Sequence, residues 1–135
     1  RYGNFNTALG RSGSNPLGGE EKDFFMRMRS QGIRYYFVPG AAIRHITPAS
    51  KLSEEYFERL TRMIGVSERI RTLGEGKSTF RRRLLAEAVK WGGTLVLATG
   101  YVLRGQAIKG RYLIRMRRNI TQGLLRGMPP AERDA

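Results

Sequence analysis

Three carboxylates follow a pair of glycines near the start of the chain. Glu20, Glu21 and Asp23 come directly after Gly18 and Gly19. Two glycines loosen the backbone, and acidic side chains are favoured in the first turn of a helix. A carboxylate at the edge of a cleft can act as a general base that removes a proton from an acceptor hydroxyl. The alternative is an acidic helix start with an ordinary capping role, and the local pattern leaves both interpretations open.

The rest of the chain offers one histidine and many basic side chains. His45 is the only histidine and there is no cysteine, so a disulfide and a thiolate metal site are excluded. The Gly-x-Ser-x-Gly motif of serine hydrolases does not occur. An acidic pair, one histidine and many arginines suit a phosphorylated donor with a carboxylate as base. A purely structural role is the alternative for His45.

The composition predicts a globular, strongly basic domain with polyanionic partners. The 135 residues include 25 Lys and Arg against 11 Asp and Glu, a net charge of +14. Residues 74–135 are the more basic part, with 13 basic and 4 acidic residues. Such a surface favours nucleic acid, anionic lipid or phosphorylated ligands. The sequence opens on Arg1 without a signal-peptide pattern, and we expect it to belong to a longer protein.

The first part of the chain predicts a loop, a helix and two extended pieces. Residues 1–19 are rich in Gly, Asn and Ser, which is typical of loops. Within them, residues 10–14 could wrap a phosphate through backbone N–H groups or serve as a flexible linkage. A helix is predicted over residues 20–31. The β-branched and aromatic run at 33–38 predicts a strand, followed by a second extended piece at 41–45.

The middle of the chain predicts a capped helix and a linker. Ser53 has the character of an N-cap, and the helix that follows it is predicted to end at Gly65. A further helical turn is predicted over residues 67–73. The stretch at 74–80 resembles only the end of a phosphate-binding P-loop, and we interpret it as a linker.

A long apolar helix is predicted over residues 81–103. Residues 91–103 carry no charge, and residues 84–103 would just reach the thickness of a bilayer as a helix. Glu87 and Lys90 interrupt this stretch. Three alternatives stay open: an interfacial or partner-packed helix, a transmembrane span, and an internal core helix.

A basic amphipathic helix is predicted near the end of the chain. Apolar residues and arginines alternate over residues 110–126, a pattern of helices that bind membrane surfaces or pack on a neighbour. We therefore expect residues 81–128 to form a basic helical tail. The residues that follow, 129–135, open on two prolines and are predicted to be disordered.

Taken together, these motifs resemble the C-terminal half of family-two glycosyltransferases with the GT-A fold. The matching residues lie between positions 3 and 72 and comprise Leu9-Gly10, Gly18-Gly19-Glu20-Glu21-Lys22-Asp23-Phe24, Arg27, Gly32, Tyr36, Pro39, Ala42, His45, Tyr56-Phe57 and Gly65-Val66-Ser67. The resemblance implies an α/β fold. Residues 1–73 would form the acceptor-side C-terminal part of a Rossmann-like GT-A domain with short strands. Residues 74–80 would link it to a membrane-apposed helical tail at 81–128.

The resemblance also implies an activity and a set of site residues. The family transfers a sugar from a nucleotide-diphosphate donor to an acceptor hydroxyl, usually with inversion and with Mg²⁺ or Mn²⁺. It implies Glu21 as the catalytic base, with Glu20 supporting the base or contacting the acceptor. The implied substrate-binding residues are Gly18, Gly19, Asp23 and Arg27, and the implied residue near the metal is His45. The family's Asp-x-Asp half is absent, so most of the metal site would lie outside these residues and this chain alone should be inactive.

The expected partners are a nucleotide-diphosphate sugar, a glycan or lipid-linked acceptor, and an anionic membrane surface. The resemblance implies cell-envelope or exopolysaccharide synthesis by a peripheral protein on the cytoplasmic face of the bacterial inner membrane, without specific nucleic acid binding. The alternative is a non-enzymatic basic module that binds nucleic acid or anionic membrane.

Overall fold

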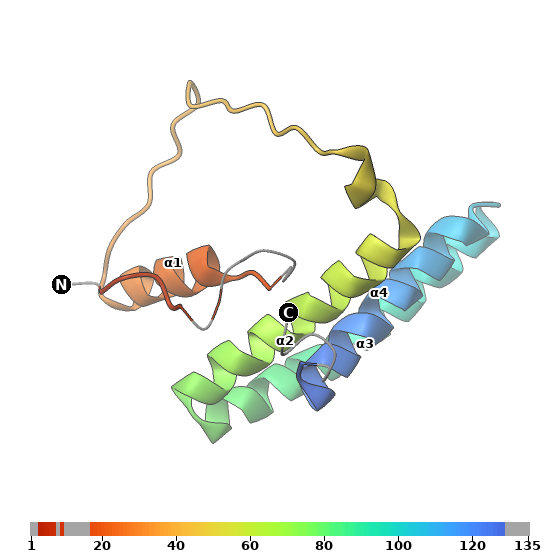
Figure 1. The fold of residues 1–135 in the computed structure, drawn as a ribbon. Coiled ribbons are helices and arrows are strands. Elements are labelled where there is room, and N and C mark those ends of the chain that lie inside the picture. The colour runs from red at the N-terminus through yellow and green to blue at the C-terminus, as the bar shows by residue number, and fades with distance from the viewer. Residues whose placement is uncertain (1–2, 8, 10–16, 129–135) are drawn as a thin grey trace.

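A computed structural model of the chain describes residues 3–7, 9 and 17–128. The predicted phosphate-wrapping loop at 10–14 and the predicted disordered tail at 129–135 lie outside the described residues. The described part contains four α-helices and one short 3₁₀ helix: α1 (Glu20–Ser30), η1 (Ala49–Leu52), α2 (Glu54–Glu75), α3 (Lys77–Leu103) and α4 (Ala107–Arg126). The three long helices α2, α3 and α4 lie side by side, and α1 stands next to them (Figure 1).

The predicted α/β fold is wrong, because the part of the chain that the structure describes contains no strand. The two segments expected to be extended, 33–38 and 41–45, belong to a long irregular arch that runs from α1 to η1 (Figure 1). The backbone hydrogen bonds of the arch are local turns, such as the one from the Ala41 N–H to the Val38 carbonyl at 3.0 Å, and Tyr35 contacts α1 by donating its hydroxyl to the Phe25 carbonyl. A strand needs the backbone groups of a neighbouring strand, and none lies beside these residues. The Rossmann-like GT-A architecture is therefore absent from the described residues.

The predicted N-cap of α2 is confirmed, but the predicted end of that helix is wrong. The Ser53 hydroxyl accepts a hydrogen bond from the Tyr56 N–H at 3.2 Å, as expected of a cap. The helix does not end at Gly65 and continues to Glu75. The stretch at 74–80, predicted as a linker, is helical on both sides of Gly76, which alone separates α2 from α3.

Gly65 is needed for packing, which explains why it does not end the helix. A Cβ atom on Gly65 would lie 2.0 Å from the backbone oxygen of Ile120 in α4. A Cβ atom on Gly123 would lie 2.1 Å from the backbone oxygen of Arg62 in α2. The two glycines therefore let the backbones of α2 and α4 approach closely. The burial gained there offsets the helix-propensity cost of glycine, which is about 1 kcal/mol.

The buried apolar residues lie mainly between α2 and α4. Met63, Val66 and Leu124 are almost fully buried, with 0%, 1% and 0% of their surfaces exposed. Leu17, which precedes α1, packs into the same cluster as Met63 and Val66. This contact fixes the segment before α1 against the middle of α2.

The two predicted helices of the basic tail are present, with somewhat earlier starts. α3 begins at Lys77 and α4 at Ala107, and they end at Leu103 and Arg126. One side of α3 is buried, at Glu87, Thr94 and Ala98. Among the helices that the structure describes, none combines the length and the apolar character needed to cross a membrane.

Candidate functional site

The predicted Gly18-Gly19 loop forms one wall of a cleft against α2. Gly19 has a φ of 108°, in the left-handed region that favours glycine. It lies next to Ser67 of α2: a Cβ atom added to Gly19 would be 3.5 Å from the Ser67 Cβ. The cleft has a volume of about 340 Å³ and is lined by Gly18, Gly19, Lys22, Leu60, Ile64, Ser67 and Glu68. Gly18, Gly19 and Lys22 thus line the cleft, whereas Glu20 and Glu21 are not among its lining residues.

Glu21 is exposed in the first turn of α1. It makes no hydrogen bond and no ion pair with the residues that the structure describes. No donor among the described residues occupies either carboxylate oxygen of Glu21. This is the condition that a general base must meet before its substrate arrives.

Glu20 is half-buried and one of its oxygens lacks a partner. The Glu20 Oε2 atom is inaccessible to solvent and has no hydrogen-bond partner among the described residues. A buried oxygen left in this state costs about 1–3 kcal/mol of free energy. A donor that reached Oε2 would remove this cost, but that oxygen must first be uncovered for an acceptor hydroxyl to reach it.

Asp23 and Arg27, both predicted to bind substrate, are engaged with the protein itself. The Arg27 Nε donates to the Asp23 carboxylate at 3.0 Å, and the Arg27 Nη2 donates to the Asn4 carbonyl at 2.7 Å. The guanidinium also lies 5.5 Å from the centre of the Phe24 ring. Neither Asp23 nor Arg27 lines the cleft. Their contacts stabilise α1 and tie it to the segment before it.

His45 lies in the exposed arch, apart from any candidate metal centre. Within residues 3–7, 9 and 17–128, no group of three or more His, Asp or Glu side chains is arranged to hold a metal ion. The donors that Mg²⁺ or Mn²⁺ would need are therefore not assembled around His45. A metal role for His45 would require ligands beyond the described residues.

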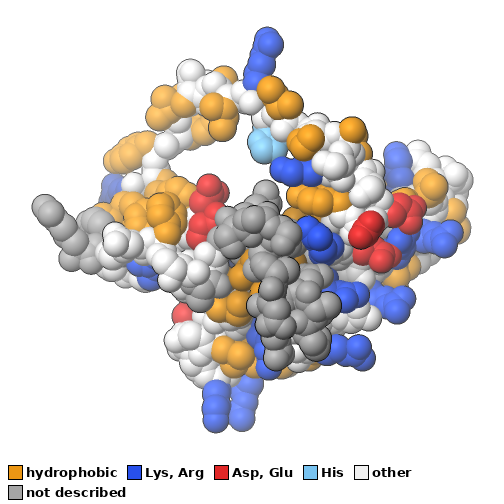
Figure 2. Space-filling view, in the orientation of Figure 1, with side chains coloured by type: hydrophobic (Ala, Val, Ile, Leu, Met, Phe, Trp, Pro, Cys, Tyr) orange, Lys and Arg blue, Asp and Glu red, His pale blue; other side chains and the backbone are white. Residues whose placement is uncertain are grey.

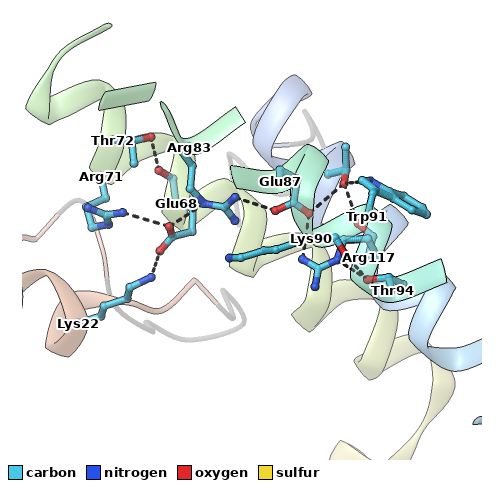
Figure 3. A network of polar contacts seen from close by, with 11 residues as sticks. Lys22, Glu68, Arg71, Thr72, Arg83, Glu87, Lys90, Trp91, Thr94 and Arg117 are labelled. Carbon is cyan, nitrogen blue, oxygen red and sulfur yellow. Dashed lines mark hydrogen bonds and ion pairs between the residues drawn. The ribbon is translucent and has the colours of Figure 1, made fainter. Parts of the chain in front are cut away.

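Sequence reasoning missed the residues that hold α1 against the helical unit formed by α2, α3 and α4. The Glu68 carboxylate on α2 accepts hydrogen bonds from Lys22 of α1, from Arg71 at 3.1 Å and from Arg83 of α3 at 3.1 Å (Figure 3). Burial disfavours the charged form of Glu68, but the bonds from Lys22 and Arg71 outweigh it. They lower the pKa of Glu68 from 4.5 to about 2.

A second carboxylate extends this network into the helical unit. Glu87 is only 3% exposed and pairs with Arg83 at 2.7 Å and with Arg117 of α4 at 3.0 Å (Figure 3). Burial again opposes ionisation of Glu87, and the two guanidinium groups outweigh it and lower its pKa. The spacing of Arg83 and Glu87 is readable in the sequence as a helical pair. The pairing of Lys22 with Glu68 joins residues 46 positions apart, which no local pattern reveals.

The lowered pKa of Glu68 predicts a loss of stability in acid. A carboxylate whose pKa is lower in the folded state stabilises the fold above its unfolded pKa and loses this contribution as the pH falls. For Glu68 the window runs from about pH 4.5 down to about pH 2. The free energy of unfolding, measured by urea titration with circular dichroism at several pH values, is expected to fall across this window. Glu68→Gln should reduce the slope, and a slope equal to that of the unmodified chain would contradict the assignment.

Comparisons of this chain with models of known protein families, with curated proteins and with solved structures found no match.

Proposed function

We propose that this chain is the acceptor-side part of a nucleotide-sugar-dependent glycosyltransferase, with Glu21 as the base. One observation carries the proposal. In the charged run from Glu20 to Asp23, Lys22 is paired with Glu68 and Asp23 with Arg27, while Glu21 is exposed and engages no described residue. The motif around Glu21, which resembles that of family-two glycosyltransferases, supports this reaction class. We propose this reaction without a GT-A fold, because the described residues contain no strand.

The proposed reaction is a displacement at the anomeric carbon of the sugar. Glu21 accepts the proton of the acceptor hydroxyl, and the hydroxyl oxygen forms a bond to the anomeric carbon. The bond from that carbon to the diphosphate breaks, and the nucleoside diphosphate leaves with the electron pair. Attack opposite the leaving group inverts the anomeric configuration. General-base catalysis of this kind contributes about 10²–10⁴-fold to the rate.

Glu20 would position the acceptor rather than deprotonate it. Its buried Oε2, which has no partner among the described residues, would accept a hydrogen bond from a second hydroxyl of the acceptor once that oxygen is uncovered. The cleft between the Gly18-Gly19 loop and α2 offers about 340 Å³, which suits one sugar unit of an acceptor rather than a whole polymer. Ser67 and Lys22, which line it, supply polar groups for such a ligand.

The reaction can be tested with the protein as the cell produces it. The protein is incubated with a panel of UDP-, GDP- and dTDP-sugars and with glycan or lipid-linked acceptors extracted from the same cells. We expect release of nucleoside diphosphate from one class of donor, in an amount equal to the sugar incorporated. Donor hydrolysis without incorporation, or no release from any donor in the panel, would contradict the proposal.

A further inference from the structure

The side of α3 that faces away from the other helices carries an apolar stripe. The α3 stripe consists of Leu85, Val89, Val96 and Leu103, which are 70%, 77%, 73% and 82% exposed. They follow one another after four, seven and seven residues, which places them on one side of the helix. Leu95 and Val102 are exposed next to the stripe. So many large apolar side chains on one helix face indicate a surface that normally meets another apolar phase.

The opposite side of α3 is where the helix contacts the rest of the protein. Glu87, Thr94 and Ala98 are 3%, 3% and 4% exposed. Glu87 and Thr94 are hydrogen-bonded to Arg117 of α4, and Ala98 lies against Gly110. By contrast, a Cβ atom added at Gly92 or Gly93 would meet no atom within 4 Å. The stripe therefore has no partner in the described part of the chain.

Basic side chains flank both ends of the α3 stripe. Arg81 and Arg82 precede it and Arg104 follows it, all exposed and none in an ion pair with described residues. Residues 77–128 contain 12 Lys and Arg and a single acidic residue, Glu87. Glu87 is buried between Arg83 and Arg117, so it does not offset the positive charge of the surface. Basic and apolar side chains are both visible on the face shown in Figure 2.

We propose that the α3 stripe lies on the surface of an anionic lipid membrane. α3 has 27 residues and is roughly 40 Å long, and it would lie parallel to the membrane plane. Leu85, Val89, Val96 and Leu103 enter the boundary between headgroups and acyl chains. Arg81, Arg82 and Arg104 reach the lipid phosphates at the two ends. An apolar helix face with basic flanks is the feature that binds anionic bilayers.

The charge of the chain favours a membrane over the other occupants of such a face. A second copy would bring another chain of net charge +14 against the same arginines, which repel each other. Nucleic acid would satisfy the arginines but would leave the apolar stripe in contact with a charged backbone. An anionic bilayer satisfies both the arginines and the stripe. The inference is independent of the proposed sugar transfer.

The test is flotation of the whole chain with lipid vesicles. One set is phosphatidylcholine alone, and the other is phosphatidylcholine with roughly one third phosphatidylglycerol. We expect strong binding to the anionic vesicles, reduced by salt, and weak binding to the neutral ones. Arg81→Gln with Arg82→Gln should lower the partition coefficient roughly 30-fold, from the contribution of each basic residue near an anionic surface.

A matched pair of double variants separates the stripe from net charge. Val89→Glu with Val96→Glu places two carboxylates in the stripe and should reduce binding by roughly 100-fold or more. Ile43→Glu with Ile46→Glu makes the same change of charge in the exposed arch, where both residues are largely exposed, and should retain most of the binding. Equal losses in the two variants, or no binding of the unmodified chain, would overturn the proposal. A third outcome would also overturn it: the unmodified chain sediments as a dimer and binds no vesicles, and Val89→Glu with Val96→Glu converts that dimer to a monomer.

Discussion

Alanine at Gly65 or at Gly123 is expected to separate α2 from α4. The added Cβ atoms would lie 2.0 Å and 2.1 Å from backbone oxygens of the facing helix, closer than any real contact of a Cβ atom. A backbone oxygen cannot rotate away as a side chain can, so the two helices must move apart. Overpacking typically costs about 1–3 kcal/mol in the free energy of unfolding, and we expect the upper end here because the backbone itself must shift. Since small domains have only about 5–15 kcal/mol of stability, either variant should lose a large part of it.

Urea unfolding followed by circular dichroism measures this effect, and two further glycines serve as controls. Gly92 and Gly93 lie in the helical interior of α3, and a Cβ atom there would meet nothing within 4 Å. Alanine at these positions should stabilise the chain by up to about 1 kcal/mol, because it favours the helix. If Gly65→Ala were as stable as Gly92→Ala, the close packing of α2 and α4 described here would be wrong.

Glu21→Gln should abolish most sugar transfer while leaving donor binding intact. The amide keeps the size of the side chain and accepts hydrogen bonds, but it cannot take up the proton of the acceptor. The loss, about 10²–10⁴-fold, should fall on kcat, because the missing interaction acts in the transition state. Steady-state transfer by the protein as the cell produces it, beside calorimetric titration of the donor, measures the two quantities separately.

Three further variants define the role of Glu21. Glu55→Gln alters an exposed carboxylate in the first turn of α2 and should leave transfer unchanged. Glu20→Gln should have an intermediate effect if Glu20 positions the acceptor. His45→Ala tests the metal role that the resemblance implies: weaker metal-dependent donor use would support that role, and an unchanged metal requirement would contradict it. A large loss of kcat in Glu20→Gln together with a normal kcat in Glu21→Gln would assign the base to Glu20. Normal kcat values in both variants would mean that these carboxylates serve only as the acidic first turn of a helix.

The sequence predicted helices well because their signals are local. The acidic first turn of α1, the Ser53 cap and the apolar spacing in α3 and α4 lie within a few residues of what they specify. The strand at 33–38 was predicted from residue types that favour strands, but a strand also needs a neighbour, which local residue types do not supply. The predicted stop at Gly65 failed because a glycine that ends one helix can serve the packing of another.

All but one of the residues that the sequence suggested for the site, the exception being His45, lie in or directly before α1. α1 begins at Glu20, with Gly19 as its N-cap, which agrees with the predicted start of the helix at residue 20. The other wall of the cleft comes from α2, through Ser67 and Glu68, and the sequence gives no distance between the two walls. Asp23 and Arg27 carry charged groups that could bind a polar ligand, but they form an ion pair with each other. An acidic and a basic residue four positions apart on a helix are neighbours.

The attachment of α1 has a kinetic consequence. α2 is joined to α3 by one residue and α3 to α4 by three, so the contacts of α3 with its two neighbours close short loops and are expected to form early, which brings α4 onto α2. α1 is connected to these three helices through the long arch. It contacts them through Leu17 and through the Lys22–Glu68 pair, which closes a loop of 46 residues. Local opening that releases α1 would break few buried contacts and leave the packing of α2, α3 and α4 intact. The cleft is therefore expected to assemble last and to open first, on the timescale that governs entry of its ligand.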